Sequence, residues 1–198
     1  QAALCVPQTN FASAGLQTKL NSWGESINVL SQQQDALVWG STVSTNSTMT
    51  IQFQLAGNPN NDVFGIAGLG PLGPTVICPV FSSGAFGTNW FAVASFRAGN
   101  VLKVNVFDPA ANLISSGTYS GVDRTRFLYY VENAGGRFYS HAGYNPDLKV
   151  HNLVFAGTGA NAGCWWMAWE DSPNPGPTAD YNDGLLFIES LNPTPVSH

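Results

Sequence analysis

Alternation of apolar and polar residues is the feature that most restricts how this chain can fold. Between Met49 and Leu55 every second residue is apolar, and the residues between them are Thr or Gln. A period of two places the apolar side chains on one face of a β-strand. This strand is therefore predicted to bury one face and to expose the other to water.

Similar short segments recur through the rest of the chain. Further strands are expected at Val63–Ala67, Trp90–Phe96, Val101–Phe107, Leu113–Tyr119, Thr125–Val131, Arg137–Ser140, Val150–Phe155, Cys164–Trp169 and Leu185–Glu189. Gly, Pro, Asn and Asp residues separate most of these segments, as turns require. About ten short strands with turn signals between them predict an all-β, two-sheet antiparallel sandwich with a jelly-roll-like order.

Helical spacing is confined to the N-terminal part of the chain. The apolar residues of Ser13–Trp23 recur at helical intervals and Gly24 follows as a stop, which predicts one short helix. A second, weaker helix is predicted over Ser31–Val38. No linker interrupts the pattern, so residues 1–191 are expected to form a single domain, followed by an extended tail over 192–198.

The few charges of this chain are unevenly distributed. The 198 residues include 7 Lys+Arg and 12 Asp+Glu, for a net charge of -5. Clustered cations are absent, which excludes an electrostatic grip on nucleic acid, and no apolar run is long enough for a membrane span. All of the cations lie within residues 1–149, whereas 150–198 contain five acids and no Lys or Arg. The low charge is typical of a secreted protein.

Most of the acidic surplus flanks one turn. The strand Trp165–Trp169 ends in two acids, and the sequence Asp180–Asp183 precedes the last apolar run. Between them Ser172–Ala179 contains three prolines, which are expected to hold a stiff turn and bring the two strand ends together. Four carboxylates and one amide should then converge. The predicted metal ligands are Glu170, Asp171, Asp180, Asn182 and Asp183.

Calcium is the ion expected at this turn. Crowded carboxylates repel one another unless a cation lies among them. Calcium accepts about six to eight hard oxygen ligands with loose geometry, whereas zinc and copper prefer His or Cys. Sodium, magnesium, or an ion-free arrangement in which the acids cap turn amides are the alternatives. Asn60, Asn61 and Asp147 are further candidate ligands.

The acidic turn also resembles a known family. The pattern WEDxxxxxxxxDYNDxxxF over Trp169–Phe187 is similar to the C-terminal signature of a bacterial family, the domain of unknown function four-one-one-four. Asp62–Ile66 and the segment Asn145–Asp147 with His151 resemble two further pieces, so the resemblance covers residues 62–189. It implies a secreted or surface-attached bacterial protein, of the adhesin type or carrying a PEP-CTERM sorting tail, with a calcium-binding acidic motif and no established reaction.

Three cysteines are too far apart for a zinc or redox motif. Cys5, Cys78 and Cys164 are compatible with one disulfide and one remaining thiol, or with three reduced core residues. The sequence does not indicate which two cysteines would form the disulfide.

Three functions compete on these observations. The favoured one is a non-catalytic, extracellular calcium-binding module for cell-surface adhesion, biofilm matrix or surface assembly. Other copies of the protein are one expected partner, because low Lys content leaves few charges to prevent edge strands from pairing with another chain. The second is a calcium-dependent, lectin-like carbohydrate-binding module. The candidate glycan contacts are Trp166, which is expected to lie on the exposed face of its strand, and Tyr144.

The third function is a hydrolase, and it is the least favoured. Glu170 and Asp171 are neighbours on a predicted strand and should point to opposite faces, whereas the two carboxylates of a glycosidase must flank one bond. The chain has no GxSxG sequence. We therefore expect that this protein is not an enzyme.

Overall fold

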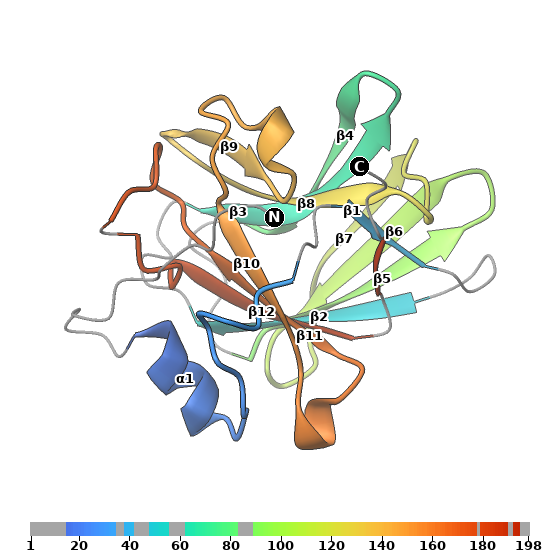
Figure 1. The fold of residues 1–198 in the computed structure, drawn as a ribbon. Helices are drawn as coiled ribbons and strands as arrows, with labels where there is room; N and C mark the ends of the chain where they lie inside the picture. The colour runs from blue at the N-terminus through green and yellow to red at the C-terminus, as the bar shows by residue number, and fades with distance from the viewer. Residues whose placement is uncertain are drawn as a thin grey trace.

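The predicted fold class is confirmed. A computed structural model describes residues 15–34, 38–41, 48–55, 62–82, 89–177, 179–189 and 192–194. These residues form an all-β sandwich of two antiparallel sheets with one short α-helix, α1 (Leu16–Ser22) (Figure 1). Two single-turn 3-10 helices, η1 (Ala142–Tyr144) and η2 (Gly159–Asn161), lie in connections between strands.

The two sheets, called sheet A and sheet B, share the strands almost equally. Sheet A contains, in order, β13 (Asn192–Thr194), β1 (Val38–Gly40), β8 (Phe127–Asn133), β3 (Val63–Gly70) and β4 (Gly73–Phe81), with β9 (Gly136–Tyr139) also paired to β8. Sheet B contains, in order, β10 (Asn152–Ala156), β11 (Trp165–Trp169), β12 (Gly184–Glu189), β2 (Thr48–Leu55), β5 (Phe91–Arg97), β6 (Val101–Phe107) and β7 (Leu113–Ser120). Early and late strands are neighbours in both sheets, as β12 pairs with β2 and β13 with β1.

The structure corrects the expectation for a second helix and for the C-terminal tail. The second helix predicted over Ser31–Val38 is wrong: residues 31–34 are not helical, the Gln34 backbone N–H donates to the Val154 carbonyl at 2.8 Å, and Val38 begins β1. In the region expected to be a tail, Asn192–Thr194 pair antiparallel with β1 as an edge strand.

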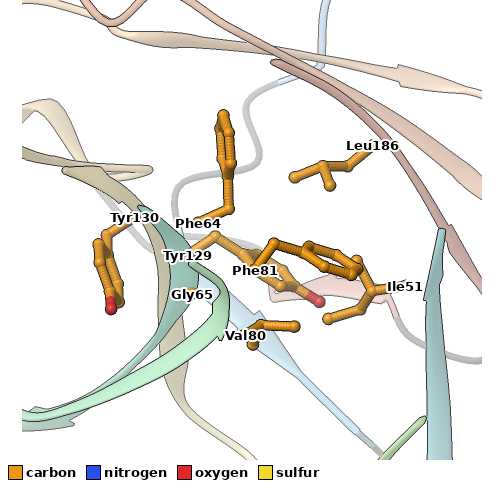
Figure 2. Close-up of a pocket in the computed structure, with 8 residues that line it drawn as sticks. All are labelled: Ile51, Phe64, Gly65, Val80, Phe81, Tyr129, Tyr130 and Leu186. Carbon is orange, nitrogen blue, oxygen red and sulfur yellow. The ribbon is translucent and has the colours of Figure 1, made fainter. Parts of the chain in front are cut away.

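The main core lies between the inner faces of the two sheets. The alternation predicted from sequence is seen on β11, where Met167 and Trp169 face this core and are fully buried. The void beside Phe64 and Leu186 has a volume of about 10 Å³, which is room for about one water molecule (Figure 2). The inner faces alone therefore supply a close-packed core.

The outer face of sheet B is also buried where it is formed by β10, β11 and β12. Leu16 and Leu20 of α1 pack over β10, β11 and β12, together with Ile27 and Val29 from the segment that follows the helix. This second apolar layer covers Trp166, which is only 4% exposed. The expectation that Trp166 faces solvent is therefore wrong, because the helix lies on the face of the sheet that the strand pattern alone left open.

The described cysteines do not form a disulfide with each other. Cys78 is buried in the main core and Cys164 is half-buried on the outer face of sheet B, and both are free thiols. Burial raises the pKa of Cys78 to about 12, so its thiol is unreactive at neutral pH. A Cys78–Cys164 pairing is excluded, while Cys5 lies outside the described residues.

Candidate metal centre

Strand pairing brings the two acidic segments together. β11 ends at Trp169 and β12 begins at Gly184, and these two residues are directly paired. The Asp183 N–H donates to the Trp169 carbonyl at 3.1 Å, so the antiparallel pairing continues one residue into the turn. The acids that follow β11 therefore lie beside the acids that precede β12, as the sequence predicts.

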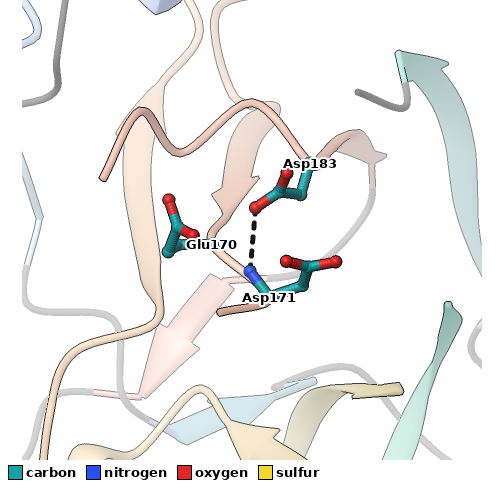
Figure 3. Close-up of side chains that lie close together, drawn as sticks. All are labelled: Glu170, Asp171 and Asp183. Carbon is teal, nitrogen blue, oxygen red and sulfur yellow. Dashed lines mark hydrogen bonds between the residues drawn. The ribbon is translucent and has the colours of Figure 1, made fainter. Parts of the chain in front are cut away.

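Three carboxylates meet at this point. Glu170, Asp171 and Asp183 each offer an oxygen, and these oxygens all lie within 4.8 Å of one another (Figure 3). Two oxygens on opposite sides of a calcium ion, each at about 2.4 Å, would be about 4.8 Å apart. The spacing therefore fits one ion of this size. Glu170 and Asp171 can converge although they are adjacent, because both lie beyond the last residue of β11.

Backbone amides of the turn fix these side chains. The Asp171 N–H donates to Asp183 Oδ2 at 2.9 Å, as Figure 3 shows. Glu170 accepts from the N–H groups of Ser172 and Asp180, at 3.3 and 3.0 Å. A carboxylate oxygen has two lone pairs. The bonds to the amides thus orient the carboxylates and leave them capacity to bind a cation.

The other two predicted ligands lie next to this group. Asp180 is buried beside Glu170, and burial followed by the charge of Glu170 raises its pKa. Asn182 is buried too, and its N–H donates to Asp180 Oδ1 at 3.3 Å. These two residues support the loop and add one carboxylate at the edge of the group.

A further carboxylate, Asp62, was not among the predicted ligands. Its side chain is hydrogen-bonded to those of Asp171 and Asn133 and is only 2% exposed, and its Oδ2 has no hydrogen-bond partner among the residues that the structure describes. Asp62 precedes β3 and comes from the other sheet. Two carboxylates can share a hydrogen bond only if one of them is protonated, and a cation would remove that requirement. An ion beside Asp171 would therefore also offer a partner to Asp62.

Phe64 explains why Asp62 reaches the group. Asp62 and Phe64 are two residues apart and lie on the same side of the chain. The Phe64 ring packs edge-on against Trp169, with the ring centroids 6.5 Å apart, and it covers Gly184. The acid at the start of β3 is thus anchored against both strands that carry the other ligands. A period of two at Asp62–Ile66 indicates only that Asp62 and Phe64 share a face, and not which turn Asp62 meets.

A buried histidine supports the loop from the other side. His151 Nε2 lies 2.9 Å from Asp147 Oδ2, and its Nδ1 lies 2.9 Å from the Glu170 carbonyl. The two ring nitrogens thus connect the Asp147 carboxylate to the backbone of Glu170. Asp147 Oδ2 also accepts from the Asn174 N–H at 2.8 Å. Asp147 therefore binds the loop rather than the carboxylate group.

Protons are held tightly at this cluster. Burial raises the pKa of Asp62 to about 7, and the charge of Asp171 adds to this effect. Burial also raises the pKa of Asp183 to about 8, with further contributions from the charges of Glu170 and Asp171. The fold thus holds these acids where their ionised forms are disfavoured unless a cation compensates.

The candidate glycan contacts lie away from this centre. Trp166 stacks on Trp23 with a centroid distance of 5.1 Å, and its Nε1 donates to Glu25 Oε1 at 2.7 Å. Tyr144 is half-buried against the outer face of sheet A, beside the ring of His141. Neither ring forms part of the metal centre. Asn60 and Asn61 lie outside the described residues.

Two comparisons with known proteins were negative. No family model matches it, and no curated protein matches it. The resemblance of its acidic turn to the four-one-one-four family stays a prediction. Within the described ranges, no helix combines the length and the apolar character needed to cross a bilayer.

The raised pKa values predict how stability depends on pH. Between the unfolded values near 3.8 and the folded values near 7 and 8, the folded protein binds more protons than the unfolded chain. The free energy of unfolding without calcium should therefore fall as pH rises from 5 to 8.5. We expect a loss of at least about 1 kcal/mol, which lowers Tm by about 2–4 °C in a chain of this size. Thermal unfolding in a chelator across this range measures it, and Asp183→Asn should flatten the slope.

Proposed function

We propose that this protein is a non-catalytic calcium-binding β-sandwich module that acts outside the bacterial cell, in adhesion, biofilm matrix or surface assembly. The observation that carries the proposal is the convergence of Glu170, Asp171 and Asp183, with Asp62 hydrogen-bonded to Asp171 and its buried Oδ2 unpartnered among the described residues. In the described part of the chain, the ion pairs join Arg137 to Glu132 and His151 to Asp147, so neither neutralises this cluster. A divalent cation supplies the missing charge.

The bonding of the acids supports a structural role for the ion. Glu170 and Asp183 accept N–H groups of their own turn, and Asp171 is bonded to Asp62 from the facing sheet. A bound ion would therefore connect sheet A to the β11–β12 turn of sheet B. An ion that joins two sheets in this way stabilises the domain.

An exposed sheet edge supports assembly with other copies. β7 is the last strand of sheet B, it contains no charged residue, and Leu113 and Ile114 are exposed on it. Uncharged edge strands readily pair with another chain. Light scattering with and without calcium tests this part of the proposal, and a monomer at every concentration would contradict it.

Calcium should raise the melting temperature. An ion that binds only the folded state at about 100 times its Kd adds about 2.7 kcal/mol, or about 5–10 °C for a domain of this size. Differential scanning calorimetry in calcium, in magnesium and in EDTA measures the shift. We expect magnesium to act more weakly because it requires a more regular, smaller site.

Two variants distinguish an ion site from an ordinary acidic surface. Asp183→Asn removes a disfavoured charge but keeps an oxygen that can accept from the Asp171 N–H. We expect this variant to be more stable than the parent in EDTA and to gain little from calcium. Glu189→Gln, at the opposite end of β12, is the matched control and should retain the full calcium shift. A calcium shift that is absent in the parent, or unchanged in Asp183→Asn, would contradict the proposal.

A further inference from the structure

A cavity opens directly over the acidic cluster. It has a volume of about 370 Å³ and is bounded by Glu170, Asp180 and Asp183 on one side. Residues of the proline-rich turn, including Pro173, Pro175 and Gly176, complete its lining. Sites for small molecules usually have volumes of about 300–1,000 Å³. The cavity is therefore large enough for a ligand as well as an ion.

We propose that this cavity binds a neutral glycan, whose adjacent hydroxyl groups complete the coordination of the calcium ion. The inference rests on the calcium site proposed above and adds a ligand to it. The protein ligands approach the ion from β11, β12 and β3, and calcium accepts about six to eight oxygens. Positions on the side of the ion that faces the cavity are open to oxygens of a ligand.

The charge of the site selects the class of ligand. The carboxylates of Asp62, Glu170, Asp171, Asp180 and Asp183 carry five negative charges when all are ionised, and calcium returns two. The ring of the nearby His151 is hydrogen-bonded to Asp147 rather than to these carboxylates. The occupied site would therefore stay negative and repel uronates, phosphates and acidic peptides, whereas hydroxyl oxygens bind calcium without adding charge.

The wall formed by the turn is prepared for a sugar ring. Pro173 and Pro175 line the cavity and add aliphatic surface, which suits the C–H face of a pyranose. The turn is also fixed in place: the Asn174 N–H donates to Asp147 Oδ2, and Asn133 Nδ2 donates to the Asp171 carbonyl at 3.1 Å. A wall held in this way loses little conformational freedom on binding, which favours affinity.

Gly176 allows the cavity to be filled without disturbing the metal ligands. A Cβ at Gly176 would meet only the Asn174 carbonyl oxygen, at 3.9 Å, so a side chain there enters open space. Gly176→Trp should occupy the cavity, whereas Gly176→Ala leaves most of it open. The two variants form a matched pair at one position.

The experiment titrates the protein with methyl α-mannopyranoside, methyl β-galactopyranoside and methyl β-glucopyranoside, which present different diol geometries, and with methyl β-glucuronoside as the charged comparison. Ligand-observed NMR in calcium or in EDTA follows glycoside binding, and calorimetry follows calcium binding separately. We expect at least one neutral glycoside to bind in calcium only, more tightly than the glucuronoside. Gly176→Trp should weaken that binding at least about tenfold and leave calcium binding unchanged, while Gly176→Ala retains both.

The outcomes separate the two proposals. Calcium binding without binding of any neutral glycoside would overturn the glycan inference and leave the calcium site in place. Absence of calcium binding would overturn the proposed function itself. Tighter binding of the glucuronoside, or glycoside binding that persists in EDTA or in Gly176→Trp, would show that the cavity is not the site inferred here.

Discussion

Replacing Glu25 by Ala should lower the free energy of unfolding by about 3–5 kcal/mol, although Glu25 lies outside the metal centre. Its carboxylate accepts hydrogen bonds from Thr158 N–H and Oγ1, at 2.7 and 2.6 Å, from Asn161 Nδ2 at 2.6 Å and from Trp166 Nε1 at 2.7 Å. Glu25 is 4% exposed. Hydrogen bonds to a charged group contribute about 1.5–3 kcal/mol each, and donors left buried without a partner cost more. Denaturant unfolding measures the loss.

The matched control is an acid at the surface. Glu132 pairs with Arg137 at 2.7 Å, and both side chains are about one-third exposed. Glu132→Ala should cost no more than about 1 kcal/mol, as exposed ion pairs do. Equal losses in the two variants would show that the Glu25 bonds do not hold the helical segment to sheet B.

The pH dependence of the Glu25 contribution gives a second measurement. Burial alone would raise the pKa of Glu25, but the hydrogen bonds from Thr158, Trp166 and Asn161 outweigh it, and the net pKa is below the ordinary 4.5. Its contribution is therefore complete above pH 4.5 and is lost as pH falls through the lower, folded value. Acid unfolding of Glu25→Gln should lack this component, whereas that of Glu132→Gln should retain it.

The network around Glu25 has no local signal in the sequence. Its partners lie 133 to 141 positions further along the chain. An acidic residue is rarely buried unless it is paired, so the residue type alone predicts an exposed Glu25. Only the position of α1 on the outer face of sheet B brings Glu25 to Trp166, and the same packing explains why Trp166 is not exposed. The burial of Glu25 and of Trp166 therefore depends on tertiary packing, which strand periodicity does not predict.

Most of the strands could be predicted because alternation and turn residues are local properties. The central strands of sheet B, such as β5 and β6, alternate buried and partly exposed residues along their length. β4 was missed because it contains Pro74 and Pro79, which weaken a strand assignment. It lies at the edge of sheet A, where a strand tolerates missing N–H donors, and so does β13, which contains Pro193.

The candidate metal centre was predictable in part for a similar reason. Glu170, Asp171 and Asp183 flank a single turn, so hairpin geometry alone brings them together. Asp62 belongs to the other sheet, and no spacing rule connects it to the turn. Its position depends on how Phe64 packs across the sandwich.

Gly184→Ala should therefore disturb both the core and the metal centre. A Cβ at Gly184 would overlap the ring of Phe64, which is 1% exposed and has little room to move. Overpacking of this kind costs about 1–3 kcal/mol. Movement of Phe64 would also shift Asp62 away from Asp171, while Asp183 precedes the altered residue directly. We expect a lower Tm in EDTA and weaker calcium binding, measured by calorimetry.

A second change can restore what the first removes. Phe64→Leu shortens the side chain that meets the new methyl group, so the double variant should recover stability relative to Gly184→Ala. In the double-mutant cycle, the two changes together should destabilise the protein less than the sum of their separate effects. Gly176→Ala is the control, because a Cβ there meets no atom closer than 3.9 Å. Calcium binding that is unchanged in Gly184→Ala would mean that Asp62 contributes nothing to the ion. A recovery of calcium affinity together with stability would show that the contact between Phe64 and Gly184 sets the position of Asp62, and so links the packing of the two sheets to the binding of the metal.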